Sequence, residues 1–321
     1  YLDALSGQPM HPAAQAAITG FTDRGWADPS LPHHEGRLAH QILQAARETV
    51  ASALGVAPSA VTFHPNSALA TLAVGGAAAA AGTRSSSTRV ITSRVERRTI
   101  LTAAAQAVGT THVTEVSVDP RGAIDCDELR NAITDGEGDA GVLVVQAANT
   151  ELGTLQPLSD VIGAGRDAHM PIVTDATGAA GFTDIPDGWS VLVAEAYSWG
   201  GPAGVGVMVI ADPSAWRGPS VADGGATTAH PKDTADVLAA VGAAAALDAV
   251  MREQAEIRPR LHDLIAQVRA DVPAAVADVD MLGDPDDRLP HIVTFSCLYA
   301  DGERLASELD RRGVAVGSGS A

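Results

Sequence analysis

Short runs rich in β-branched residues alternate with alanine-rich helical stretches along this 321-residue chain, from about residue 89 onward. Runs that are apolar on both faces are typical of strands in a parallel sheet that helices cover on both sides. The sequence therefore predicts an α/β fold, with ligands expected at the polar or glycine-containing strand ends. The predicted strands are 89–93, 112–118, 142–147, 172–175, 191–194 and 205–210, and the predicted helices between them include 99–108, 126–134 and 158–169.

A second, smaller unit is expected after residue 240. The longest helical pattern covers residues 236–269 and should be interrupted near Pro259, because proline lacks the backbone donor that a helix interior needs. Beyond it we predict a strand near 291–298, a helix near 303–311 and a last strand at 314–316. The predicted domains are a large α/β domain, residues 1–240, and a small α+β domain, residues 241–321.

The formal net charge of −18 argues against some classes of partner. An acidic surface repels phosphate backbones and anionic lipids, so neither nucleic acid nor a membrane is expected as a partner. The run 70–81 is too short and too weakly apolar to cross a bilayer, and no signal segment precedes Tyr1, so a cytoplasmic location is expected. Cys126 and Cys297 form neither a metal-ligand spacing nor a disulfide framework, which fits a reducing compartment.

Several short motifs follow one another along the chain. They are Tyr-Leu-Asp at 1–3, His-His-Glu-Gly-Arg at 33–37, Ile-Thr-Ser at 91–93, Asn-Thr-Glu-Leu-Gly-Thr at 149–154, Val-Thr-Asp-Ala at 173–176, Trp-Gly-Gly-Pro at 199–202, Arg-Leu-Pro-His at 288–291 and Val-Gly-Ser-Gly-Ser-Ala at 316–321. Their order and spacing resemble class V aminotransferase-type proteins of the cysteine desulfurase branch, a family that uses pyridoxal phosphate (PLP). The resemblance covers nearly the whole chain. It implies the fold type I PLP-dependent transferase fold, with a large, mostly parallel sheet of seven strands, a small C-terminal domain and a homodimer.

The resemblance places a serine where the family chemistry needs a lysine. A PLP enzyme uses a lysine amine to form an imine with the cofactor and to move a proton at the substrate. Ser198 stands at that position, and a hydroxyl cannot form an imine. The chain has a single lysine, Lys232, which lies elsewhere. Covalent loading of the cofactor at position 198 is therefore excluded.

Three further positions of the implied site carry charged side chains. Glu195 stands where the family has a hydroxyl donor to the cofactor phosphate, and a carboxylate within ~4 Å of that dianion would cost a few kcal/mol. Arg97 replaces the histidine that stacks on the cofactor ring, and a guanidinium can stack but cannot act as a base near neutral pH. Asp175 matches the aspartate that contacts the ring nitrogen. The alternative for Asp175 is a strand-end aspartate that caps the next helix.

The resemblance adds further candidates for cofactor binding. The first residues of one predicted helix are Asn66, Ser67 and Ala68, and their backbone amides could bind the phosphate. The family has Asn and Gln at the positions of Thr150 and Gly178, and Tyr197 directly precedes Ser198. A loop that reaches the neighbouring subunit's cofactor in the family matches the segment with Lys232 and Thr234. The alternative for Lys232 is a solvated lysine paired with Asp233. No metal ligands are expected.

A desulfurase also needs a mobile cysteine that carries the persulfide. The sequence stops at Ala321, directly before the position where the resemblance places that cysteine. Cys297 is a poor substitute because it lies in an apolar strand, and Cys126 lies among acids that should raise its pKa.

Other kinds of site find little support. The glycine-rich run 200–206 falls between two predicted strands, whereas a dinucleotide site needs such a run between a first strand and its helix. The histidines are too dispersed for a metal hydrolase. Ser198 lacks the small-residue elbow and the nearby histidine base of a serine nucleophile.

Two functions remain after these exclusions. The first is an inactive or non-canonical paralogue that serves as a scaffold or regulatory subunit, with a sulfur carrier or a paralogous subunit as its partner. The second is an active PLP-dependent cysteine desulfurase, which transfers sulfur from L-cysteine with noncovalent PLP or with a partner subunit's lysine. The first is favoured because four substitutions weaken one site, at Arg97, Gly178, Glu195 and Ser198.

Overall fold

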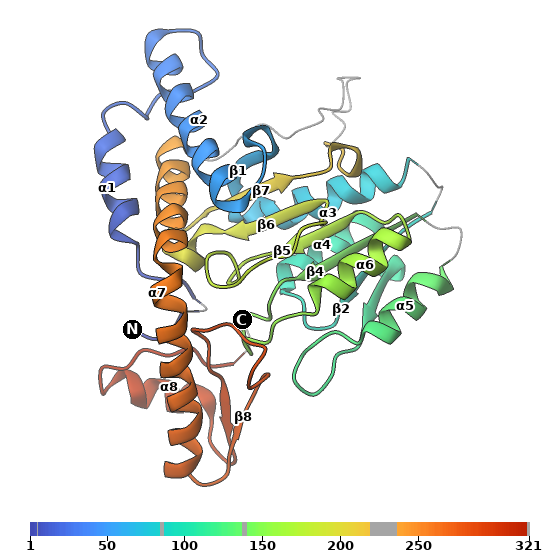
Figure 1. Ribbon diagram of the computed structural model, residues 1–321, viewed down its shortest axis with the longest axis vertical. Helices are drawn as coiled ribbons and strands as arrows, with labels where there is room; N and C mark the ends of the chain where they lie inside the picture. Colours follow the sequence, from blue (N-terminus) through green and yellow to red (C-terminus); the bar gives the residue numbers. More distant parts are fainter. Residues whose placement is uncertain (5, 84–86, 137–139, 219–235, 320–321) are drawn as a thin grey trace.

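The computed structural model describes residues 1–4, 6–83, 87–136, 140–218 and 236–319. Over these residues the large sheet has seven strands in the order β1-β7-β6-β5-β4-β2-β3, which confirms the predicted α/β class (Figure 1). Only β7 runs antiparallel to its neighbours β1 and β6 within that sheet. The strands are β1 (Val61–Pro65), β2 (Thr88–Ser93), β3 (Val113–Val116), β4 (Ala140–Gln146), β5 (Ile172–Asp175), β6 (Val191–Glu195) and β7 (Val205–Ile210).

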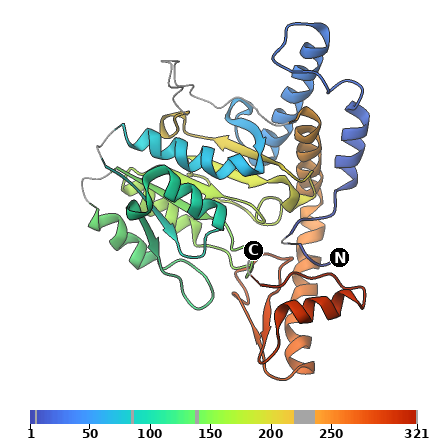
Figure 2. The same ribbon diagram turned by 180° about the vertical axis from the view of Figure 1, so that it is seen from behind.

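The buried strands divide their apolar side chains between two core layers. Val142 and Val144 of β4 pack in one layer with α3 (Asn66–Ala81) and α4 (Arg98–Val108). Leu143 and Val145 point into the opposite layer, because successive side chains of a strand face opposite sides. That second layer is completed by α2 (His34–Leu54), α5 (Cys126–Asp135), α6 (Leu158–Asp167) and the first turns of α7 (Val237–Ala275) (Figures 1 and 2).

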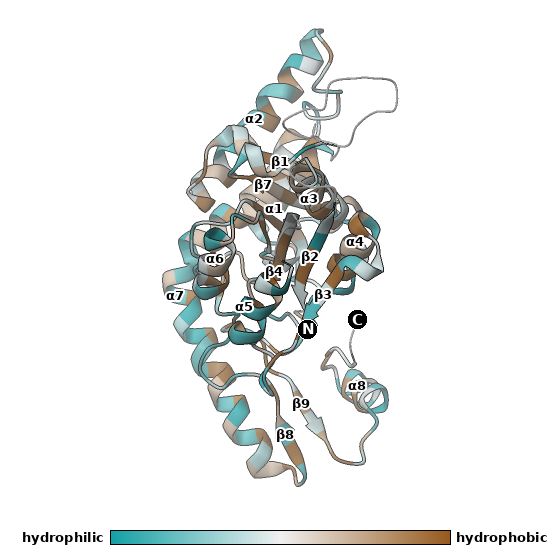
Figure 3. Cartoon of the chain, turned by 90° about the vertical axis from the view of Figure 1, so that its right-hand side faces the viewer, coloured by the Kyte–Doolittle hydropathy of each residue, from teal (hydrophilic) through white to brown (hydrophobic). Residues whose placement is uncertain are grey.

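The exposed sides of α2 and α5 are largely hydrophilic, as expected for helices that cover a sheet (Figure 3). Within the described ranges, no helix combines the length and the apolar composition that crossing a bilayer requires.

Helix α7 runs without a break from the large sheet to the small C-terminal unit (Figure 1). The predicted interruption at Pro259 is therefore wrong, because this proline lies inside the 39-residue helix. Packing on both sides of the proline explains the continuity. The first half of α7 is buried against α1 (Pro12–Phe21) and α2, and Arg288 Nη2 donates to the His262 carbonyl oxygen in the second half, 3.3 Å away. Tertiary contacts thus outweigh the ~3 kcal/mol that an internal proline costs.

The small unit contains an antiparallel pair of strands, β8 (Val279–Met281) and β9 (Phe295–Cys297), followed by α8 (Gly302–Asp310). The predicted strand 291–298 is thus shortened to β9, and β8 was not predicted. The predicted strand at 314–316 is wrong: this segment has no ladder partner among the described residues, although Leu2 N donates to the Ala315 carbonyl oxygen at 2.8 Å. The predicted domain boundary at residue 240 falls within α7.

Candidate functional site

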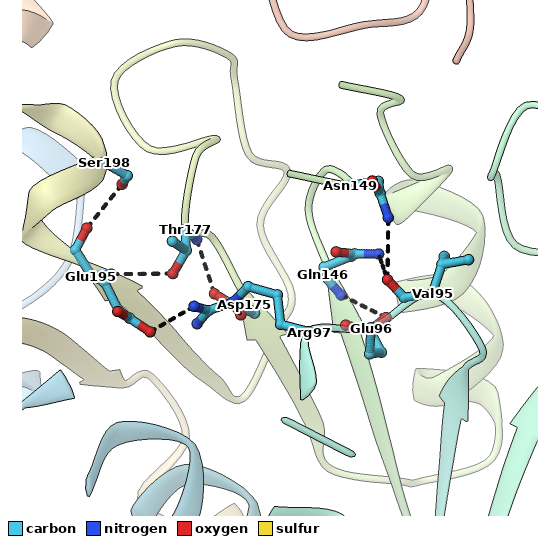
Figure 4. Close-up of polar contacts among 9 residues, drawn as sticks. All are labelled: Val95, Glu96, Arg97, Gln146, Asn149, Asp175, Thr177, Glu195 and Ser198. Atoms are coloured by element: carbon cyan, nitrogen blue, oxygen red, sulfur yellow. Dashed lines mark hydrogen bonds and ion pairs between the residues drawn. The ribbon is translucent and has the colours of Figure 1, made fainter. Parts of the chain in front are cut away.

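Arg97 bridges two carboxylates at the carboxyl edge of the large sheet (Figure 4). Its Nε donates to Asp175 Oδ2 and its Nη1 donates to Glu195 Oε1, each at 2.6 Å. Asp175 ends β5 and Glu195 ends β6, and these neighbouring strands are parallel, so both carboxylates reach the same edge of the sheet. Arg97 arrives there as the residue before the first turn of α4. We call these three residues the Arg97 clasp.

The clasp is largely shielded from water. The exposed fraction of the side chain is 1% for Asp175, 10% for Glu195 and 18% for Arg97. Burial raises the pKa of Glu195, although Arg97 opposes that rise. Burial lowers the pKa of Arg97, but the two carboxylates more than offset this and the net shift is upward. Each charge in the clasp therefore depends on its partners, because an unpaired buried charge is strongly unfavourable.

A second set of hydrogen bonds fixes the two strand ends. Asp175 Oδ1 accepts a hydrogen bond from Thr177 N at 2.9 Å, and Thr177 Oγ1 accepts one from Glu195 N at 3.2 Å. Ser198 Oγ donates to the Glu195 carbonyl oxygen at 2.9 Å. Both carboxylate oxygens of Asp175 are therefore already hydrogen-bonded within the chain. The bond to Thr177 is also the type of local backbone contact expected of a strand-end aspartate.

Glu96 is a buried acid beside the clasp to which sequence reasoning gave no role. Its Oε1 accepts hydrogen bonds from Ser93 Oγ at 2.8 Å and from Gln146 N at 3.1 Å, whereas its buried Oε2 has no hydrogen-bond partner. Burial raises the pKa of Glu96 to about 8. At neutral pH the carboxyl group is thus largely protonated. An acid three residues after a buried strand and next to Arg97 was the signal that could have drawn attention to it.

The turn that carries Arg97 is held by two amide side chains. Gln146 Nε2 donates to the Val95 carbonyl oxygen at 2.7 Å, and Asn149 Nδ2 donates to the same oxygen at 3.2 Å (Figure 4). Together with Glu96, these bonds fix the loop between β2 and α4, and with it the backbone position of Arg97.

Four of the predicted site residues surround a very small cavity. Thr150, Gly178, Tyr197 and Ser198 all line it, and its volume is about 10 Å³. This is room for about one water molecule. Gly178 adopts the left-handed conformation with φ of 81°, and a Cβ atom there would lie 3.1 Å from Thr150 Cγ2. The backbone of Gly178 therefore favours glycine, whereas the resemblance places a glutamine at this position.

The hydroxyl group of Tyr197 lies close to the clasp. Burial raises the pKa of Tyr197, and the nearby charge of Glu195 adds to the rise. The ring of Tyr197 also packs near Gly7, where a Cβ atom would lie 3.6 Å from the ring. Tyr197 therefore links the N-terminal segment to the strand ends.

The predicted anion-binding turn forms the start of α3. Asn66, Ser67 and Ala68 are its first residues, and Pro65 before them supplies no side-chain cap. The amides of this first turn could receive an anion. However, among the described residues Asn66 Oδ1 is a buried acceptor without a hydrogen-bond partner. An anion bound next to this oxygen would be repelled by it.

The remaining predicted residues lie outside the described residues or away from the clasp. Lys232 and Thr234 lie outside the described residues. Cys126 and Cys297 are partly buried free thiols, and burial raises the pKa of Cys126, with a further contribution from Asp160, in the predicted direction. Across the described ranges, no group of three or more His, Cys, Asp or Glu residues could hold a metal ion.

The residues present do not fit PLP in this arrangement. Ser198 provides no amine, and Arg97 and Thr177 already pair with the two carboxylate oxygens of Asp175, the residue that the resemblance places against the ring nitrogen. The Glu195 carboxylate lies in the same cluster, where a phosphate would add further negative charge. The cavity beside Ser198, at about 10 Å³, is itself too small to hold a pyridine ring.

Comparisons with known proteins identify relatives of the whole chain. The family model described as aminotransferase class-V matches residues 1–321. An IscS-like cysteine desulfurase of Mycobacterium tuberculosis is 30% identical over 329 residues, which cover 100% of this chain and 83% of that protein. The cysteine desulfurase IscS of Dictyoglomus turgidum is 27% identical over 327 residues, covering 100% and 81%. The solved structure of a NifS-like protein from Rickettsia africae has the same fold, with a TM-score of 0.84 at 19% identity, covering 100% of this chain and 87% of that one.

Proposed function

The chain belongs to the aminotransferase class V family, and on that premise we propose that it is a cysteine desulfurase-type protein that no longer performs PLP chemistry. Its scaffold would then serve as a regulatory or structural subunit. The observation that carries this proposal is the Arg97 clasp, because Arg97 pairs with the Asp175 carboxylate that the family mechanism needs for the cofactor.

Three substitutions act together in support of this proposal. Ser198 replaces the family lysine, and Arg97 replaces the family histidine. Glu195 replaces the residue whose hydroxyl group donates to the cofactor phosphate. Arg97 and Glu195 pair with each other at 2.6 Å, so each compensates the buried charge of the other. A new, internally satisfied network at a former cofactor site is what selection for a stable scaffold would leave.

The partners in this role are a second copy of the chain, a paralogous subunit or a sulfur carrier. The acidic net charge of −18 favours a partner with a basic surface. A cytoplasmic protein of the sulfur-transfer machinery would fit this description.

The competing function is an active desulfurase with noncovalent PLP or with a partner subunit's lysine. In its favour, Asp175 remains at the strand end and the first turn of α3 is uncapped by a side chain. In such an enzyme, Arg97 would have to leave Asp175 before the cofactor could bind.

Titration of the purified protein with PLP separates the two functions. We expect no aldimine absorbance and no sulfide release from L-cysteine, with the Mycobacterium tuberculosis desulfurase as positive control and Lys232→Ala as matched variant. A stoichiometric band that disappears in Lys232→Ala, together with sulfide release, would establish a lysine-dependent enzyme and refute the scaffold function. A stoichiometric band that persists in Lys232→Ala would support noncovalent PLP and also count against the proposal.

A further inference from the structure

A second and much larger cavity lies between the N-terminal segment and the middle of α7. Its volume is about 350 Å³, and residues from 1–9, from 181–182 and from 250–261 line it together with His291. This volume lies at the lower end of the range for small-molecule sites, ~300–1,000 Å³. The cavity is therefore large enough for a small organic ligand.

Three buried polar atoms of the lining residues have no hydrogen-bond partner among the described residues. They are Gln254 Oε1, Arg258 Nη2 and His291 Nδ1. Gln254 and Arg258 are four residues apart on α7, so their side chains lie on the same face of the helix. A buried polar atom without a partner is costly, so this wall of the cavity is polar and incompletely paired.

Arg258 gives the cavity a positive edge. Its Nη1 donates to Asp184 Oδ1 at 2.9 Å, and its Nε donates to the Gly181 carbonyl oxygen at 3.4 Å. The Asp184 side chain is 96% exposed, so water screens its charge. The Asp184 carboxylate therefore neutralises the Arg258 guanidinium only in part. No carboxylate is among the described residues that line the cavity. The guanidinium charge therefore favours an anionic ligand.

The rest of the lining is mainly apolar. Leu2, Phe182, Val250, Ile257 and Leu261 all contribute to the walls. The Leu2 side chain is largely exposed in the absence of a ligand, so a bound molecule would remove apolar surface from water.

His291 supplies a neutral polar group. Its ring packs against the Phe182 ring with 4.0 Å between the centroids. Burial lowers the pKa of His291 to about 4, so the imidazole is uncharged near neutral pH. Among the described lining side chains, a ligand thus meets the cation of Arg258 and neutral polar groups that include Gln254 and His291.

We propose that this cavity binds a small organic monocarboxylate with an apolar body. The Arg258 guanidinium supplies the positive charge that attracts the carboxylate, Gln254 and His291 also line the cavity, and the apolar body packs on Phe182, Val250 and Leu261. This site is separate from the clasp, and its existence does not depend on whether the clasp admits a cofactor.

Calorimetric titration of the full chain with 3-phenylpropionate tests the proposal, with 3-phenylpropanol as the neutral counterpart. We expect saturable binding of the acid with a dissociation constant in the millimolar range or below, and binding of the alcohol weaker by about tenfold or more. Arg258→Gln should weaken binding of the acid by a similar factor. Arg258→Lys should retain part of the affinity, because the positive charge remains.

Arg252→Gln is the matched control on the same helix. The Arg252 side chain is 77% exposed and pairs with Asp248, away from the cavity lining, so its replacement should leave binding unchanged. Leu261→Trp fills the cavity and should abolish binding of both compounds, and circular dichroism shows whether each variant is folded. Three results would overturn the proposal: no saturable binding of 3-phenylpropionate, equal binding of the alcohol, or equal losses in Arg258→Gln and Arg252→Gln.

Discussion

Arg97 Nε lies 2.6 Å from Asp175 Oδ2, although 78 residues separate the two in the sequence. In the family that this chain belongs to, the corresponding aspartate is the residue expected to contact the cofactor ring. The same guanidinium reaches Glu195 through its Nη1. One side chain thus neutralises two buried carboxylates at the carboxyl edge of the large sheet, and the following predictions test this arrangement.

Replacing Arg97 by methionine should destabilise the fold by about 3–5 kcal/mol, because Asp175 and Glu195 would be left buried without a cation. Urea unfolding measures the change. Arg130→Met is the control, since Arg130 pairs with Asp127 on the exposed face of α5 and its loss should cost at most about 1 kcal/mol. Similar costs for the two variants would show that the clasp contributes nothing particular to stability.

Ser198→Lys alone should not create a PLP-binding protein. Arg97 would still occupy Asp175, and Glu195 would still repel a phosphate group. The triple variant Arg97→His, Glu195→Thr, Ser198→Lys removes both obstacles and should bind more PLP, measured as aldimine absorbance that borohydride reduction fixes to the protein. If the single variant showed as strong an aldimine band as the triple variant, the lysine would be the only element missing for PLP binding.

Glu96→Gln should change the pH dependence of stability. Glu96 has an ordinary pKa of 4.5, which burial raises to about 8 in the folded protein. Below the lower value both states carry the proton, and between the two values only the folded state keeps it. Between pH 4.5 and about pH 8, rising pH therefore lowers the free energy of unfolding of the wild type relative to that of the neutral glutamine variant. The total change is on the order of a few kcal/mol, and the difference in free energy of unfolding stays constant above this window.

Urea unfolding of the wild type and Glu96→Gln at about pH 5 and about pH 8 measures this effect, because the difference between them removes the titration of His64, His291 and other groups. A free-energy difference that is the same at both pH values would show that the Glu96 pKa is not raised.

Gly178→Ala should cost about 1–2 kcal/mol, because φ is 81° at this residue and alanine is strained there. The added Cβ would also lie 3.1 Å from Thr150 Cγ2. Gly163 in α6 is the control, since a Cβ there meets nothing within 4 Å and alanine is the better helix former. Thermal unfolding should show opposite shifts for the two variants. A stabilising Gly178→Ala would contradict the described loop.

Continuous β-branched runs made some strands predictable from sequence. The predicted ranges 172–175 and 205–210 coincide with β5 and β7. By contrast, β1 ends in Pro65 and was interpreted only as a turn, and β8 and β9 are three residues long, too short to show a pattern. The continuity of α7 through Pro259 depends on packing at both ends of the helix, which a proline rule does not include.

The candidate site was predicted only in part. Motif order placed Arg97, Asp175, Glu195 and Ser198 in one region, and the structure brings them together. The pairing of Arg97 with both carboxylates was not predicted, because it depends on how two strand ends face a helix start. The cavity at Arg258 was missed for the same reason, since its walls come from three distant segments and from His291.

A crystal structure of the protein grown with excess PLP tests the central claim most directly. We predict that the Arg97 guanidinium still bridges Asp175 and Glu195 and that no pyridine ring contacts Asp175. A PLP ring nitrogen within hydrogen-bonding distance of the Asp175 carboxylate, with Arg97 displaced from it, would contradict the claim.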